Sequence, residues 1–126
     1  MTQDDRIQYW KASALKDKQT ATTLYTARDY HWSLFFWQLV LEKLLKSLIL
    51  KRDKEPLFTH NLVNLAEEAD ISLTSTEREE LREITTFNLE ARYDDEKFSF
   101  YKKATKSYAD HWIEMCSRFA NTWEIL

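Results

Sequence analysis

The sequence predicts an all-α domain, a four-helix up-and-down bundle with one additional short helix, over residues 1–126. Two observations support this prediction. The chain has no glycine and one proline, whereas most β-hairpins need residues that accept positive φ angles. Apolar residues also recur at steps of three and four, as they do on one face of a helix. A chain of 126 residues has the length of a single domain.

The first helix is predicted from about Asp4 to Ala27. Its apolar residues return at steps of three, four or seven and form one face: Ile7, Trp10, Ala14, Ala21 and Leu24. Three threonines between Lys18 and Thr23 lower the helix propensity of its middle. Packing against the rest of the bundle therefore has to hold that turn in place.

The second helix is predicted from about Trp32 to Arg52, and its first ten residues, WSLFFWQLVL, are apolar on nearly every side. Such a helix has to be covered on two sides, by its own bundle or by a second subunit. We expect a homodimer contact here. The later half is amphipathic and places Glu42, Lys43 and Lys46 on its polar side, where Glu42 and Lys46 can pair.

A short third helix is predicted after the loop that contains Pro56, because proline disfavours helical backbone at the residue before it. Thr59 is its expected N-cap, and the helix should run from His60 to about Ala69. Its apolar residues share one face: Leu62, Leu65, Ala66 and Ala69.

The fourth helix is expected to begin at Thr74-x-x-Glu77, which has the spacing of a capping box, and to end around Arg92. The last helix has the most regular pattern, in alternating steps of three and four: Phe98, Tyr101, Thr105, Tyr108, Trp112, Met115, Phe119 and Thr122. This pattern is typical of the seam of a helical bundle.

Composition excludes several classes of protein. Eighteen basic and 21 acidic residues give a net charge of −3, so a general attraction to nucleic acid or to an anionic membrane is not expected. The apolar run from Trp32 to Leu41 is about half as long as a membrane-spanning helix. A lone Cys116 and a polar, acidic beginning of the chain favour the cytoplasm.

Cofactor signatures are also missing. Without glycine the chain cannot form a phosphate-binding glycine loop, and one cysteine with three separated histidines does not make a zinc ligand set. We therefore expect no cofactor and no metal ion.

Two segments before residue 70 carry residues that could bind a ligand. Lys43 and Lys46 form either an ordinary solvated face or an edge that faces phosphate. His60, at the start of the third helix, is either a structural side chain that bonds a neighbouring loop or a ligand contact.

A third segment follows the fourth helix. Arg92 offers a planar fork for phosphate or carboxylate, and Tyr93 an aromatic face for stacking. The alternative is an ion pair of Arg92 with Asp94 or Asp95 that closes the turn.

Taken together, these segments resemble the HEPN domain, a helical-bundle family. QLVLEKLLKSLIL (Gln38–Leu50) is similar to the second-helix signature of that family, with its glutamine, Glu-Lys pair and lysine in a leucine-rich run. FTHNLVNLAEEA (Phe58–Ala69) resembles its Thr-His-x-Leu-x-x-Leu segment, and EARYDDE (Glu90–Glu96) its Ala-Arg-Tyr-Pro-Asp turn. The order and spacing agree over nearly the whole chain, although Asp94 stands where the family often has proline.

The resemblance implies a four-helix bundle, usually a homodimer, that is often encoded beside a small nucleotidyltransferase. Many members are RNases of toxin-antitoxin and defence systems, which use an arginine followed after four to six residues by a histidine. This chain has no such pair. Arg52 and His60 have seven residues between them, across the Pro56 loop, and Arg92 has no histidine downstream within four to six residues.

The leading interpretation is a non-catalytic module of a two-component, toxin-antitoxin-like system, which binds a nucleotide, RNA or a partner nucleotidyltransferase. The residues expected to bind the ligand are Lys43, Lys46, His60, Arg92, Tyr93 and Asp94. One alternative is a HEPN endoribonuclease with a displaced active site, in which His60 or a substitute acts as base. The other is a helical dimer that serves only protein interaction.

Overall fold

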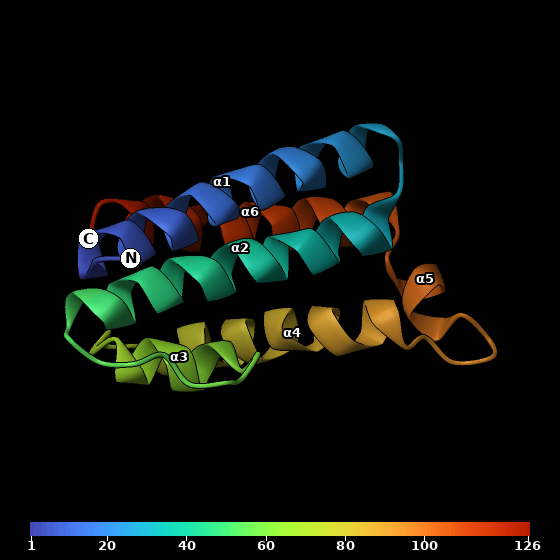
Figure 1. Ribbon diagram of the computed structural model, residues 1–126. Coiled ribbons are helices and arrows are strands. Elements are labelled where there is room, and N and C mark those ends of the chain that lie inside the picture. The colour runs from blue at the N-terminus through green and yellow to red at the C-terminus, as the bar shows by residue number, and fades with distance from the viewer.

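The computed structural model describes all 126 residues and contains six helices and no β-strand. Four long helices run alternately up and down, and two short ones lie in the connections (Figure 1): α1 (Gln3–Thr26), α2 (Tyr30–Lys51), α3 (Leu62–Glu68), α4 (Ser75–Arg92), α5 (Ser99–Lys103) and α6 (Lys106–Glu124). Both termini lie at one end of the bundle, and α5 lies at the opposite end. The predicted fold class is confirmed.

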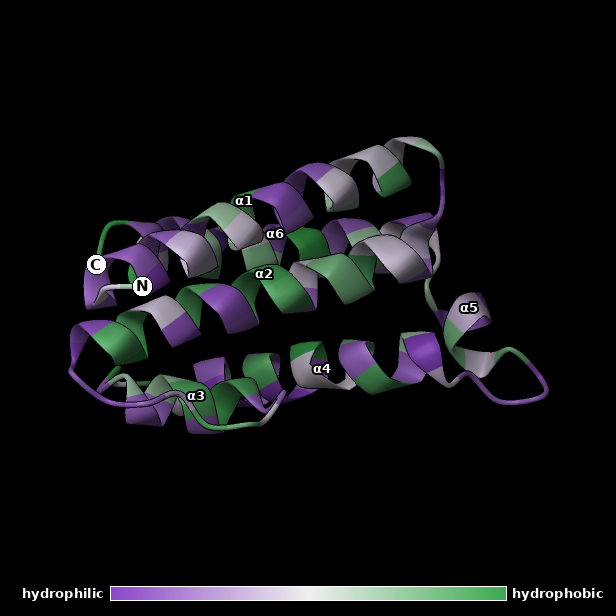
Figure 2. Cartoon of the chain, in the orientation of Figure 1, coloured by the Kyte–Doolittle hydropathy of each residue, from purple (hydrophilic) through white to green (hydrophobic).

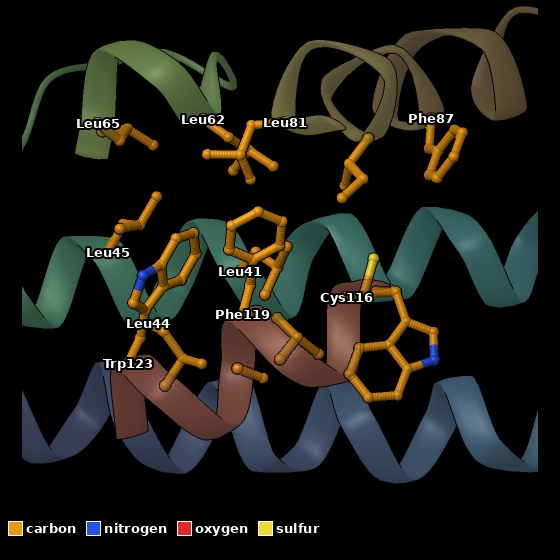
Figure 3. Packing of buried hydrophobic residues seen from close by; sticks show 14 of the residues in the cluster. Leu41, Leu44, Leu45, Leu62, Leu65, Leu81, Phe87, Cys116, Phe119 and Trp123 are labelled. Carbon is orange, nitrogen blue, oxygen red and sulfur yellow. The ribbon is translucent and has the colours of Figure 1, made fainter. Parts of the chain in front are cut away.

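The central helix of the bundle is α2, which packs against each of the other five helices. In Figure 3, labelled side chains of α3 and α4 lie on one side of α2 and those of α6 on another. Leu41, Leu45 and Ile49 are fully buried as a result. The predicted burial of α2 on two sides is confirmed and is achieved within a single chain. Phe35 and Phe36, near its beginning, stay partly exposed.

The outer helices are amphipathic, and Figure 2 shows hydrophobic and hydrophilic stretches that alternate along α4 and α6. The buried face of α6 consists of Ala109, Cys116, Phe119, Ala120 and Trp123. The predicted seam included Thr122, which is exposed, in place of Trp123. From Phe119, a step of three leads to Thr122 and a step of four leads to Trp123, and both steps fit a helical spacing. The predicted face was therefore partly wrong. None of the helices is both long enough and apolar enough to cross a membrane.

Helix α4 begins with the predicted capping box. The hydroxyl of Thr74 accepts a hydrogen bond of 3.1 Å from the backbone N–H of Glu77, whose carboxylate accepts one of 2.9 Å from the N–H of Thr74. Thr2 and Asp5 form the same arrangement at the start of α1. In each case two backbone N–H groups that have no partner inside the helix are satisfied.

Helix α3 is shorter than predicted, because Asn61 and not Thr59 is its N-cap. The side-chain oxygen of Asn61 accepts a hydrogen bond of 3.0 Å from the N–H of Asn64. The Thr59 hydroxyl accepts one of 3.1 Å from the N–H of Asn61 and so stabilises the turn before the helix. His60 therefore lies in this turn and not on α3.

The predicted single last helix is wrong, because the chain leaves helical backbone between α5 and α6. Thr105 is the N-cap of α6, and its hydroxyl accepts a hydrogen bond of 3.2 Å from the N–H of Tyr108. Phe98 precedes α5 in the left-handed region, with a φ of 55°. Phe98 and Tyr101 consequently leave the bundle seam, and their side chains are 61% and 60% exposed.

Helix ends in this chain are turned without glycine. Arg28, Asp53 and Asp70 follow α1, α2 and α3 with φ angles of 62°, 57° and 60°. The left-handed region costs a non-glycine residue roughly 1–2 kcal/mol, and aspartate tolerates it better than most. These three positions therefore lower the stability of the fold while they set the direction of the connections.

We expect Thr74→Ala to lower the free energy of unfolding by about 1 kcal/mol, because the N–H of Glu77 loses its acceptor. Urea denaturation followed by circular dichroism measures this loss. The matched control is Thr76→Ala, since Thr76 is an exposed threonine of the same helical turn. Equal losses in the two variants would contradict the assignment of the cap.

Candidate functional site

The two lysines expected to bind a ligand are paired inside the bundle. Lys43 Nζ lies 2.6 Å from Asp17 Oδ2 and donates a hydrogen bond of 2.7 Å to the hydroxyl of Ser13, both on α1. Lys46 Nζ lies 3.0 Å from Glu42 Oε2, as predicted, and 5.2 Å from the centre of the Trp10 ring. The interpretation of this face as solvated is wrong, because α1 covers it.

His60 is held by a buried carboxylate. Glu42, which is 5% exposed, lies with Oε1 2.7 Å from His60 Nδ1 and also accepts hydrogen bonds from Lys46 and Gln38. A carboxylate partner makes Nδ1 the protonated nitrogen, so Nε2 is left as an acceptor on a side chain that is 55% exposed. The backbone carbonyl of His60 accepts a hydrogen bond of 3.0 Å from Gln38 Nε2. His60 therefore makes the kind of structural contact that one of its two interpretations describes, with α2 as the partner, and its role as a ligand contact stays a prediction.

Arg92 has no carboxylate partner. Its Nε donates a hydrogen bond of 3.0 Å to the carbonyl oxygen of Asn88, and Nη2 donates to the side-chain oxygen of the same residue. Its guanidinium carbon lies 5.2 Å from the centre of the Tyr93 ring and 5.9 Å from that of Phe35. The predicted alternative of an ion pair that closes the turn is wrong.

Asp94 and Asp95 are instead used to begin α5. Asp94 accepts backbone hydrogen bonds of 3.0 Å from Phe100 and 2.9 Å from Tyr101. Asp95 accepts them from Lys97 and Ser99 and also from the Ser99 hydroxyl. Desolvation pushes the pKa of Asp94 upwards, but the backbone N–H groups outweigh it and hold the pKa below its usual value. The two acids thus stabilise the turn and leave Arg92 free.

A groove of about 630 Å³ lies where the beginning of α2, the end of α4 and α5 meet. This size is within the range of small-ligand pockets, roughly 300–1,000 Å³. It is lined by His31, Trp32, Ala91, Arg92, Asp94, Phe98, Tyr101 and Lys102. Of the residues predicted as ligand contacts, the groove contains Arg92 and Asp94, and Tyr93 lies beside Arg92.

Sequence reasoning missed most of this lining. The apolar steps place Phe98 and Tyr101 on the bundle seam, and the predicted second helix begins after His31. One usable signal was the segment KFSFYKK (Lys97–Lys103), which contains three lysines and three aromatic residues and no acid. Such a combination is typical of surfaces that bind single-stranded nucleic acid.

His31 is mostly buried among aromatic rings at the edge of the groove. Its ring centre lies 5.2 Å from that of Trp32 and 5.2 Å from that of Tyr101. Asp29 Oδ1 lies 3.3 Å from Nδ1 of the same imidazole. These contacts place the ring in the groove that also contains Arg92, and its Nδ1 has no hydrogen-bond partner.

The HEPN domain family model matches residues 7–126, which include nearly all of α1 and every later element. This chain belongs to the HEPN domain family. Searches of curated proteins and of solved structures gave no match. The family resemblance read from the three sequence segments is confirmed.

The opposite side of the turn in this HEPN domain is acidic. A smaller hollow of about 210 Å³ contains Glu90, Tyr93, Asp94 and Lys103. Burial raises the pKa of Glu90, and the charges of Glu83 and Asp94 add to this effect against the opposing effect of Lys103. The lining of this hollow thus contains three acids, Glu90, Asp94 and Asp95, and one cation, Lys103. No cluster of three or more His, Cys, Asp or Glu side chains is arranged to hold a metal ion.

We expect Asp94→Asn to remove part of the acid sensitivity of this HEPN domain. The pKa of Asp94 is lower in the folded chain than its ordinary value of 3.8. The ionised carboxylate of Asp94 therefore stabilises the folded state fully above about pH 4. This contribution is lost as the pH falls through the lower folded-state pKa.

The free energy of unfolding, measured by urea denaturation from pH 6 to pH 2.5, tests this expectation. The difference in the free energy of unfolding between wild type and Asp94→Asn should become smaller below about pH 4. Glu96→Gln is the control, because Glu96 is an exposed acid of the same loop. A difference that stays constant with pH would contradict the role of the carboxylate.

Proposed function

We propose that this HEPN domain binds a nucleotide or a short single-stranded RNA in the groove at the α5 end of the bundle. The observation that supports the proposal is the combination of two cations with three aromatic rings in one groove: Arg92 and Lys102 with Trp32, Phe98 and Tyr101. Cations neutralise phosphate, and aromatic rings stack on bases of any sequence.

The charges of the groove suit an anion although the whole chain carries −3. Neither Arg92 nor Lys102 forms an ion pair with a carboxylate. The acid in the lining, Asp94, is already the acceptor of three backbone N–H groups. Binding by such a local cationic site does not require a basic protein.

The aromatic side chains of the groove are available for stacking. Phe98 and Tyr101 are more than half exposed, and so is Tyr93, which lies beside Arg92. Stacking on an aromatic ring contributes roughly 1–3 kcal/mol per base. Phe98 and Tyr101 in one groove with Arg92 support stacking of a base beside a phosphate that Arg92 binds.

The other three residues predicted to bind the ligand on the earlier helices are not part of the proposed groove. Lys43, Lys46 and His60 are held by carboxylates, so a phosphate would have to replace those bonds to reach them. The homodimer, the nucleotidyltransferase partner and the toxin-antitoxin setting remain predictions. The partly exposed Phe35 and Phe36 near the start of α2 support the first of these.

We expect Arg92→Ala and Tyr101→Ala each to weaken binding of a six-nucleotide oligo(A) RNA by roughly tenfold, through loss of a charge-assisted bond and of a stacked base. Fluorescence anisotropy with a labelled oligonucleotide measures the affinity. Arg118→Ala and Tyr9→Ala are matched controls, because both side chains are exposed and lie outside the groove. Failure of the wild type to bind AMP or oligo(A) would overturn the proposal.

RNA cleavage is a second candidate function, supported by the presence of His31 and Arg92 in the same groove. In such a reaction His31 accepts the proton of a ribose 2′-hydroxyl, and the 2′-oxygen attacks the adjacent phosphorus. The bond from phosphorus to the 5′-oxygen breaks, and that oxygen takes a proton from solvent. The products are a 2′,3′-cyclic phosphate and a 5′-hydroxyl, while Arg92 and Lys102 stabilise the charge on the phosphate oxygens.

Incubation of the protein with RNA in the presence of EDTA tests this candidate. Cleavage that leaves 2′,3′-cyclic ends and falls at least a hundredfold in His31→Ala is the expected result for a general base. His111→Ala is the control, since His111 lies on the exposed face of α6. Intact RNA after prolonged incubation with the wild type would exclude cleavage and leave binding as the function.

A further inference from the structure

A chain of buried hydrogen bonds runs between α2 and α4 and ends at Arg92. Gln38 Nε2 donates to Glu42 Oε1 at 3.2 Å and to the carbonyl of His60 at 3.0 Å. Asn88 Nδ2 then donates to Gln38 Oε1 at 2.8 Å, and Asn88 Oδ1 accepts from Arg92 Nη2. Gln38 and Asn88 are both almost completely buried.

The orientation of each amide in this chain is determined by its neighbour. The acceptors Glu42 and His60 require the NH₂ group of Gln38, so its oxygen has to face Asn88. That oxygen in turn requires the NH₂ group of Asn88, so the oxygen of Asn88 has to face Arg92. A reversed amide at either position would place donor against donor or oxygen against oxygen in a buried site, which is costly.

Arg92 is held by this arrangement at two of its N–H groups. Nε donates to the backbone carbonyl of Asn88, and Nη2 donates to its side chain. A guanidinium has five N–H donors, so Nη1 and the second hydrogen of Nη2 stay free. The side chain lies over the rings of Phe35 and Tyr93. The two bonds to Asn88 and the two rings therefore restrict the orientation of the guanidinium, and Arg92 is part of the groove lining.

We infer that Asn88 and Gln38 are positioning residues, which hold the guanidinium of Arg92 in the orientation that binds a phosphate of the ligand. The inference rests on the proposed function of the groove. A flexible arginine loses side-chain entropy when it binds, whereas one that is already oriented loses less. Neither Asn88 nor Gln38 lines the groove, so their effect on the ligand acts through Arg92.

A double-mutant cycle on ligand affinity tests the inference. The variants are Asn88→Ala, Arg92→Lys and the double variant, and the probe is the labelled six-nucleotide oligo(A) RNA. Each single substitution should weaken binding by roughly five- to tenfold, and the double variant should be no weaker than Arg92→Lys alone. This is because lysine has no fork for Asn88 to orient. Gln38→Met, which keeps the length of the side chain, should weaken binding in the same direction.

Folding is controlled separately from affinity. Circular dichroism and thermal unfolding are recorded for every variant, and affinities are measured well below the lowest melting temperature. If Asn88→Ala does not fold, Asn88→Leu replaces it, because leucine has a similar shape and size but no oxygen that accepts from Arg92. The same lack of additivity with Arg92→Lys is expected for it.

The outcomes distinguish the inference from the proposed function. A wild type that does not bind the probe removes both. A second outcome is that Arg92→Ala weakens binding while Asn88→Ala lowers only the melting temperature and leaves the affinity unchanged. This outcome overturns only the positioning role. Fully additive effects of Asn88→Ala and Arg92→Lys also overturn it, whereas a non-additive loss confirms it.

Discussion

The buried amide of Gln38 is the constraint on which the arrangement of this domain depends. Gln38 is 0% exposed and lies in the middle of the central helix, so every polar atom of its amide needs a partner inside the protein. The partners come from three places: Glu42 on α2, the carbonyl of His60 before α3, and Asn88 on α4. Satisfying them sets the register of α4 against α2 and the path of the loop before α3. Apolar packing alone would tolerate several registers, whereas this set of bonds is complete in only one.

The end of the bundle that carries the groove is shaped by turn chemistry. Asp94 and Asp95 accept backbone N–H groups at the start of α5, and Phe98 takes a left-handed conformation there. This turn directs Phe98 and Tyr101 away from the bundle and towards His31, at the beginning of α2. An ion pair of Arg92 with one of these acids is what the sequence alternatively predicted. Because they bond the backbone, the fold obtains a stable turn and an unpaired arginine from the same residues.

Much of the fold was predictable, and the errors have physical causes. Apolar periodicity and the Thr74 capping box are local signals, so the long helices before residue 92 were placed within two residues of their observed bounds. The last helix was read as continuous because Phe98 and Tyr101 continue its apolar steps, and an N-cap threonine such as Thr105 resembles a seam residue in sequence. Lys43 and Lys46 have the spacing of a solvated face, yet α1 covers them and supplies Asp17 and Trp10 as their partners. Spacing along one helix contains no information about which element lies across it.

The sequence by itself determined that the chain is helical, that it belongs to the HEPN domain family and that a long helix ends around Arg92, next to Tyr93. These properties depend on residues close together in the chain, through propensity, capping and motif spacing. Only the tertiary structure decided that His31 and Tyr101 share a groove with Arg92, and that Gln38 reaches Arg92 through Asn88. These contacts join residues far apart in the chain. They exist because the helices pack in one register, which is a property of the whole bundle and not of any single segment.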